Sequence, residues 1–151
     1  MKKVYFLLLL VLGSMGVWGQ VLTENFSYTA GQPITANGWT AHNAAGTNAI
    51  TVTSPGLTYA GHPGSGVGNA VTMTTTGEDD NKALSSAITT GSAYTSFLVN
   101  VSAAQATGDY FVGLLATTST FPIRIYAKST TGGFSLGLVR MALQESVMKQ
   151  L

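Results

Sequence analysis

The chain has 151 residues, of which seven are Lys or Arg and six are Asp or Glu, giving a formal charge of +1. It has no cysteine, which excludes a disulfide framework, a thiol nucleophile and a thiolate metal site. After Lys2 and Lys3 there is no run of basic residues, so the chain lacks the charge pattern of proteins that bind nucleic acid or anionic membranes.

Residues 1–19 have the pattern of a secretory signal peptide. Lys2 and Lys3 are followed by a continuous apolar run at residues 4–12 and then by small residues. A membrane anchor would need roughly 20 apolar residues, about twice the length of this run. We expect cleavage before Gln20, export through the inner membrane, and a protein that is secreted or held at the cell surface. Removing both lysines leaves five basic against six acidic residues, so the mature charge is 5 − 6 = −1.

Glycine and threonine dominate the sequence after this segment, and neither is a good helix former. The first half of the chain alternates short apolar segments with Gly/Pro turns, which predicts strands. These strands are expected at residues 21–28, 38–42, 50–53, 57–59, 71–76 and 84–88. Residues 61–69 read GHPGSGVGN and residues 77–81 read GEDDN, and both are expected to form loops or turns.

The second half of the chain carries the strongest periodic signal. Residues 94–101 alternate between apolar and polar positions, and residues 110–116 are apolar on both sides, as in a central strand. Residues 123–128 alternate cleanly, as a half-buried strand does. A hairpin at residues 129–133 is expected to join them to a last strand at residues 134–138.

Eight or nine short strands with turns between them predict an all-β fold, a two-sheet antiparallel β-sandwich of the jelly-roll type. An up-and-down barrel is the alternative, while an outer-membrane barrel would need strands of about 9 to 11 residues. We expect a signal helix at residues 1–19, one sandwich domain at residues 20–140, and an atypical tail at residues 141–151. The tail has no Gly or Thr and is rich in helix formers. It is expected either to form a short helix or to be an irregular segment after a frameshift or truncation that cuts the sandwich short.

Two long motifs carry a resemblance to a known family. They are FSYTAGQPITANGWTAHNAAGTNAITVTSPGLTYAGHPGSGVGNAVTMTTTGEDDN, which begins at Phe26, and YTSFLVNVSAAQATGDYFVGLL, which begins at Tyr94. With them, residues 26–138 resemble a domain near the N-terminus of secreted multi-domain proteins of Bacteroidota-type bacteria. The resemblance implies a laminin-G-like or concanavalin-A-like jelly roll, which usually precedes other modules and a C-terminal type IX secretion sorting domain. It implies no catalytic residues.

Exposed aromatic side chains are candidates for stacking against sugar rings. Tyr126 shares its predicted strand face with Arg124 and Lys128, so its ring is expected to remain accessible. Trp39 lies near a loop, where its ring is either exposed or part of the core. We therefore expect Trp39, Tyr126 and Arg124 to bind a ligand, with an extracellular polysaccharide or cell-surface polymer as the partner.

The sequence has one acidic cluster, whose oxygen atoms are suited to Ca²⁺. It consists of Glu78, Asp79, Asp80 and Asn81. The run does not follow the alternating pattern of an EF-hand loop, so a solvated turn is the alternative reading, and no other cofactor is indicated. His42 and His62 have no second histidine at metal-ligand spacing, and the serines lack the Gly-x-Ser-x-Gly elbow of a hydrolase.

These features favour a secreted, non-catalytic β-sandwich module that binds extracellular glycan or another polymer, or serves as a structural and adhesive unit. The alternatives are a small glycoside hydrolase or lyase, and a truncated non-functional fragment of a longer secreted protein. A glycoside hydrolase needs two carboxyl groups about 5 to 9.5 Å apart across the scissile bond, and few carboxylates are available.

Overall fold

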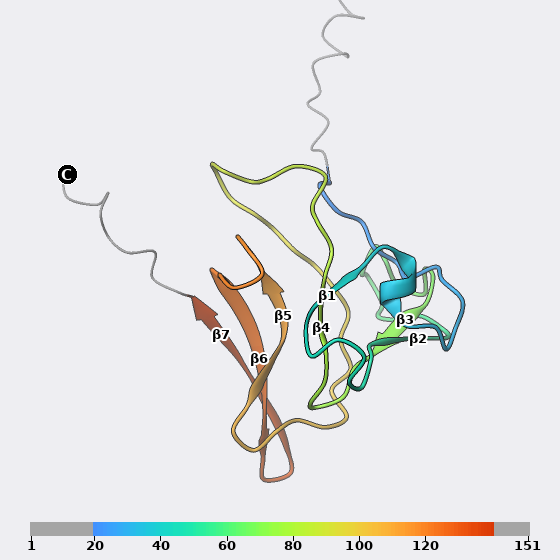
Figure 1. Ribbon diagram of the computed structural model, residues 1–151. Coiled ribbons are helices and arrows are strands. Elements are labelled where there is room, and N and C mark those ends of the chain that lie inside the picture. The colour runs from blue at the N-terminus through green and yellow to red at the C-terminus, as the bar shows by residue number, and fades with distance from the viewer. Residues whose placement is uncertain (1–19, 141–151) are drawn as a thin grey trace, which may run out of the picture. The chain divides into compact units, whose positions relative to one another are not determined.

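Figure 1 shows the computed structural model of the chain, which describes residues 20–140. In this part of the chain the one helix is the short 3-10 helix η1 (Ile34–Asn37). The strands are β1 (Thr40–Asn43), β2 (Thr51–Thr53), β3 (Ala70–Thr72), β4 (Asp79–Asn81), β5 (Asp109–Leu114), β6 (Ile123–Thr130) and β7 (Gly133–Arg140). All of their pairings are antiparallel, so the predicted all-β fold is confirmed. The predicted signal peptide (1–19) and tail (141–151) lie outside the described residues.

The strands form three small sheets. β1 pairs with β4, β2 pairs with β3, and the third sheet has the order β5-β6-β7. The two-sheet jelly-roll arrangement is therefore not confirmed. Between residues 20 and 140 there is no helix with the length and apolarity that a membrane span requires.

Two compact units make up the described chain. Residues 20–24 and 83–91 belong to the first, in which the Ser85 amide donates a hydrogen bond to the Val21 carbonyl (3.0 Å). Residues 25–82 and 92–140 belong to the second unit, which contains η1 and all the strands named above.

The best-shielded large apolar side chains in residues 20–140 are Ile34 of η1 and Val52 of β2. Backbone hydrogen bonds hold the segment around η1 against β2. The Ile34 amide donates to the Ile50 carbonyl (3.0 Å), and the Val52 amide donates to the Gln32 carbonyl (2.9 Å). The two best-shielded side chains therefore belong to segments that are joined by backbone hydrogen bonds.

Four segments that were predicted to be strands have no strand structure, namely residues 21–28, 57–59, 84–88 and 94–101. In the last of them, Phe97 makes an edge contact with the Phe111 ring (centroids 6.2 Å apart), while Val99 is exposed. Alternation identifies side chains that share a face, but a strand also needs a neighbouring edge with which to pair. Residues 94–101 do not have that neighbour among the described strands.

The predicted turn at residues 77–81 was also wrong, because Asp79–Asn81 is strand β4. Side chains reinforce its pairing with β1: the Asn43 amide donates to Asp79 Oδ2 (2.9 Å), and the Asn81 amide donates to the Thr40 carbonyl (3.0 Å). Asp and Asn are poor strand formers. Here Asp79 and Asn81 have hydrogen-bond partners across the ladder, which offsets their low propensity for strand structure.

The predicted hairpin in the second half is confirmed and is longer than expected. β6 and β7 pair without interruption from Thr130↔Gly133 to Ile123↔Arg140. The connection is Thr131 and Gly132, and Gly132 has φ +82°, a conformation that glycine adopts without a steric cost. The β5 strand, predicted at residues 110–116, runs over Asp109–Leu114.

The β5-β6-β7 sheet has two chemically different faces, because cross-strand partners share a face. The apolar face carries Val112, Leu114, Ile123, Ile125, Ala127, Phe134, Leu136 and Leu138, with the polar residues Asp109, Ser129 and Arg140 at its ends. The opposite face, here called the tyrosine face, carries Tyr110, Gly113, Arg124, Tyr126, Lys128, Gly137 and Val139. A bulge between Tyr110 and Val112 places Tyr110 on the tyrosine face, opposite Tyr126.

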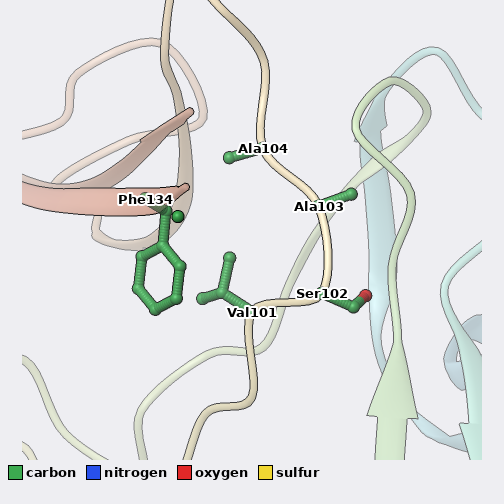
Figure 2. A pocket seen from close by; sticks show the side chains of 6 residues that line it. Val101, Ser102, Ala103, Ala104 and Phe134 are labelled. Carbon is green, nitrogen blue, oxygen red and sulfur yellow. The ribbon is translucent and has the colours of Figure 1, made fainter. Parts of the chain in front are cut away.

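A small pocket of about 250 Å³ lies beside the start of β7. Its lining is Val101, Ser102, Ala103, Ala104, Gly133 and Phe134. Figure 2 shows the side chains of Val101 and Ala104 directed toward the Phe134 side of the gap, while the Ser102 hydroxyl points away. The pocket therefore lacks the converging polar groups that orient a bound ligand.

Candidate functional site

Tyr126 and Arg124 lie two residues apart on β6 and both belong to the tyrosine face. The Tyr126 ring makes an edge contact with the Tyr110 ring of β5, with centroids 6.1 Å apart and planes at 62°. On its other side the cross-strand neighbour is Gly137 of β7, which has no side chain. Tyr126 is therefore held from one side by an aromatic partner and has no neighbouring side chain at the register position on the other.

The Arg124 guanidinium lies over two aromatic rings. Its Cζ atom is 5.1 Å from the centroid of the Tyr110 ring and 4.7 Å from that of the Phe121 ring, within the range of cation–π attraction. Gly113 is the β5 neighbour of Arg124, and a Cβ atom there would meet Arg124 Cγ at 3.5 Å and Phe121 Cδ1 at 3.6 Å. The absence of a side chain at Gly113 thus leaves room for the guanidinium and the ring to pack together.

Tyr110 connects this aromatic group to β4. Burial, followed by a hydrogen bond with the Asp79 carboxylate, raises the pKa of Tyr110 to about 12. The phenol therefore stays protonated at neutral pH, with its hydroxyl toward the Asp79 carboxylate. The same Asp79 also accepts the hydrogen bond from the Asn43 amide. Asp79 thus joins β4 to both β1 and β5.

Glu78 and Asp80 form a close pair of carboxyl groups. Glu78 is only 7% exposed, and its Oε2 accepts a hydrogen bond from the Gly46 amide (2.7 Å). Glu78 Oε1 and both Asp80 oxygens are buried with no donor from another residue among residues 20–140. Burial, and then the charge and hydrogen bonding of Glu78, raise the pKa of Asp80 to about 6. Asp80 therefore keeps its proton to a higher pH than a solvated carboxyl group does.

His42 lies on the β1 side of the Glu78–Asp80 pair, in the bulge between Ala41 and Asn43. The Asn81 amide nitrogen lies 3.1 Å from His42 Nδ1, and because an amide nitrogen can only donate, Nδ1 accepts. The His42 ring also lies against the Phe121 ring, with centroids 6.0 Å apart. Phe121 therefore contacts both the imidazole and the Arg124 guanidinium.

The four residues predicted to bind Ca²⁺ have separate partners. Asp79 accepts from Asn43 and faces Tyr110, Glu78 accepts from Gly46 and faces Asp80, and the Asn81 amide donates to Thr40 and His42. Over residues 20–140, no group of three or more His, Asp or Glu residues is placed to hold a metal ion.

Trp39, the third residue predicted to bind a ligand, belongs to a different cluster. Its ring stacks on Phe26 (centroids 5.9 Å apart, planes at 27°), and Lys82 Nζ lies 5.7 Å from its centroid. The indole nitrogen is buried without a hydrogen-bond partner in the described chain. The structure thus brings Arg124 and Tyr126 together and through Tyr110 connects them to Asp79, while Trp39 packs elsewhere.

His62 contacts a serine, but with the wrong proton arrangement for a nucleophile. Its Nδ1 accepts a hydrogen bond from the Gly64 amide (3.1 Å), so in the neutral ring the proton is on Nε2. Nε2 lies 2.9 Å from Ser96 Oγ and donates to it. A general base would have to accept the serine proton at that position.

Sequence reasoning missed Tyr110, Phe121 and His42 as members of this cluster. Tyr110 begins the predicted strand at residues 110–116, and the bulge that sets its face has no sequence signal. Phe121 precedes a proline outside any periodic segment. His42 was noted as a lone histidine, because its neighbour Asn81 is 39 positions away.

No family model, curated protein or solved structure matches the chain. The resemblance to the N-terminal domain of secreted Bacteroidota-type proteins therefore remains a prediction from the sequence.

Proposed function

We propose that this protein is a secreted, non-catalytic module that binds extracellular glycan or another surface polymer on its tyrosine face. The observation that carries the proposal is the arrangement of Arg124 and Tyr126. The guanidinium of half-buried Arg124 lies over two rings and has no carboxylate ion-pair partner in residues 20–140, so no charged acceptor in the described chain occupies its N–H groups.

The surroundings of Tyr126 support a stacking role. Its ring is oriented by Tyr110, and Gly137 leaves the neighbouring position on β7 without a side chain. A sugar ring could approach over that glycine, stack against Tyr126 and reach Arg124 on the same strand. Binding would then use apolar contact and hydrogen bonding together, as small-molecule sites do.

The carboxyl geometry favours binding over hydrolysis. Glu78 and Asp80 lie close enough for Glu78 to raise the pKa of Asp80, whereas a glycosidase holds its two carboxyl groups about 5 Å or more apart with the sugar between them. We therefore assign the buried Glu78–Asp80 pair a structural role and no part in chemistry on a substrate.

Retention of the purified chain on insoluble polysaccharides, with a glycan array in parallel, tests the proposal. We expect Tyr126→Ala and Arg124→Ala each to weaken retention about tenfold, which corresponds to about 1.4 kcal/mol. Tyr94→Ala is the matched control, because Tyr94 is 91% exposed and belongs to neither face of the sheet, and it should retain full binding. Retention on no polymer, or equal loss with Tyr94→Ala, would overturn the proposal.

A further inference from the structure

We propose that the outer edge of β7 binds a second copy of this chain, β7 against β7, to form an antiparallel six-stranded sheet. β7 pairs with β6 on one side, and in residues 20–140 no strand pairs with its other side. The backbone groups along that edge offer an unfilled ladder, and an extended strand is the structure that fills it.

β7 lacks the features that usually protect an edge strand. It has no proline, no acidic residue and no lysine, its ladder with β6 has no bulge, and its one charged residue is Arg140 at its end. All eight residues are exposed. Its large apolar residues, which are 46 to 69% exposed, are Phe134, Leu136, Leu138 and Val139.

Edge pairing accounts for this exposure better than face-to-face packing. Leu138 lies on the apolar face and Val139 on the tyrosine face, so a partner packed on one face would cover only one of them. A neighbouring strand lies beside the side chains of both faces. Together these four side chains expose on the order of 400 Å² per chain over the two faces of the strand, comparable to the largest apolar patch of a typical monomer, which is often functional.

The pairing most compatible with the side chains is centred on Gly137. A twofold axis there places Leu136 opposite Leu138 of the second copy and Phe134 opposite its Arg140, with each apolar face continuing into the other. The two Arg140 residues lie at opposite ends of the paired strands, so no like charges oppose each other. Arg140 instead meets an aromatic ring, which attracts a guanidinium.

The interface is small. Two copies bring on the order of 800 Å² of apolar side-chain surface together, below the about 1,200 Å² of a standard specific interface. We therefore expect a weak, reversible dimer whose dissociation constant lies in the micromolar range or above, roughly 1 µM or weaker. Its mass should be measured without polysaccharide, so that the result does not depend on the proposed glycan binding.

Sedimentation equilibrium of the purified exported chain from about 1 to 300 µM should show the mass rising to twice that of one chain. Leu138→Lys should weaken association at least tenfold, because the ammonium would face the apolar partner. Val67→Lys is the control, since Val67 is 50% exposed in a loop away from β7. Circular dichroism of both variants checks that each remains folded.

Single-cysteine variants then locate the proposed twofold axis, because the natural chain contains no cysteine. At Gly137 a Cβ atom meets nothing closer than Tyr126 Cβ at 4.0 Å, and at Gly133 it meets nothing within 4 Å. Under mild oxidation Gly137→Cys should form a disulfide-linked dimer and Gly133→Cys should not. A monomer mass at 300 µM, association that survives Leu138→Lys, equal cross-linking at both positions, or growth into fibres would each overturn the proposal.

Discussion

Among single residues, Asp80 gives the clearest expectation of how the free energy of unfolding depends on pH. Its pKa is about 6 in the folded protein and 3.8 in a solvated carboxyl, so between these values the folded state holds the proton more tightly than the unfolded state. The free energy of unfolding therefore falls as pH rises from about 4 to 6 and stays lower above that range. His42 lowers this pKa, while Glu78 and Asp79 raise it.

Asp80→Asn should remove this dependence. We expect the variant to melt about 3 °C higher than the natural chain at pH 8 and to show little difference at pH 4, because the amide carries no charge and can donate to Glu78. Thermal unfolding followed by circular dichroism at both pH values measures this. Asp109→Asn is the control, since Asp109 is exposed. An Asp80→Asn variant that melts lower at pH 8 would contradict the prediction.

Two glycines in the 61–69 loop allow the cost of a left-handed backbone conformation to be measured apart from the cost of a steric clash. Gly61 and Gly68 have φ of +86° and +68°, but a Cβ atom at Gly61 meets nothing within 4 Å, whereas one at Gly68 would lie 2.0 Å from the Asn25 carbonyl oxygen. We expect Gly61→Ala to cost about 1 to 2 kcal/mol and Gly68→Ala about 3 kcal/mol or more. Urea unfolding of both variants gives the comparison, and equal losses would argue against this close approach.

The elements differ in how well their amides are protected from exchange. β6 is paired on both sides, while residues 94–104 have no strand pairing. Hydrogen–deuterium exchange should therefore be complete within seconds at residues 94–101 and at least a hundredfold slower across β6. Slow exchange at residues 94–101 would show that the alternating pattern does form a strand in solution.

Local elements were predictable from the sequence and long-range pairings were not. The β6–β7 hairpin follows from alternation in residues 123–128, a Gly-containing turn and alternation again, all within a short stretch. The pairing of β4 with β1 depends on hydrogen bonds between residues about 40 positions apart, which no local pattern signals. The same separation explains the candidate site: Arg124 and Tyr126 share a strand and were identified together, whereas their connection through Tyr110 to Asp79 requires the fold.

For the whole molecule, the small number of shielded side chains predicts weak cooperativity. In residues 20–140 the buried apolar residues are Ile34, Val52 and Ala127, and no disulfide can compensate. Since the slope of urea unfolding scales with the surface exposed, we expect about 1 kcal/mol per molar urea, at the low end for small proteins. Fluorescence and circular dichroism should both be followed, and a steep transition that coincides in both would contradict the expectation.

The two-residue connection between β6 and β7 also bears on the order in which the chain folds. A hairpin of this kind closes within about 10 µs, whereas Thr40 and Asn81 must first close a much longer loop. β6 and β7 are also synthesised after every other strand described. The quickest structure to form is thus the last part of the described chain to emerge from the ribosome, and β5 gains its β6 partner only when translation of that part is nearly complete.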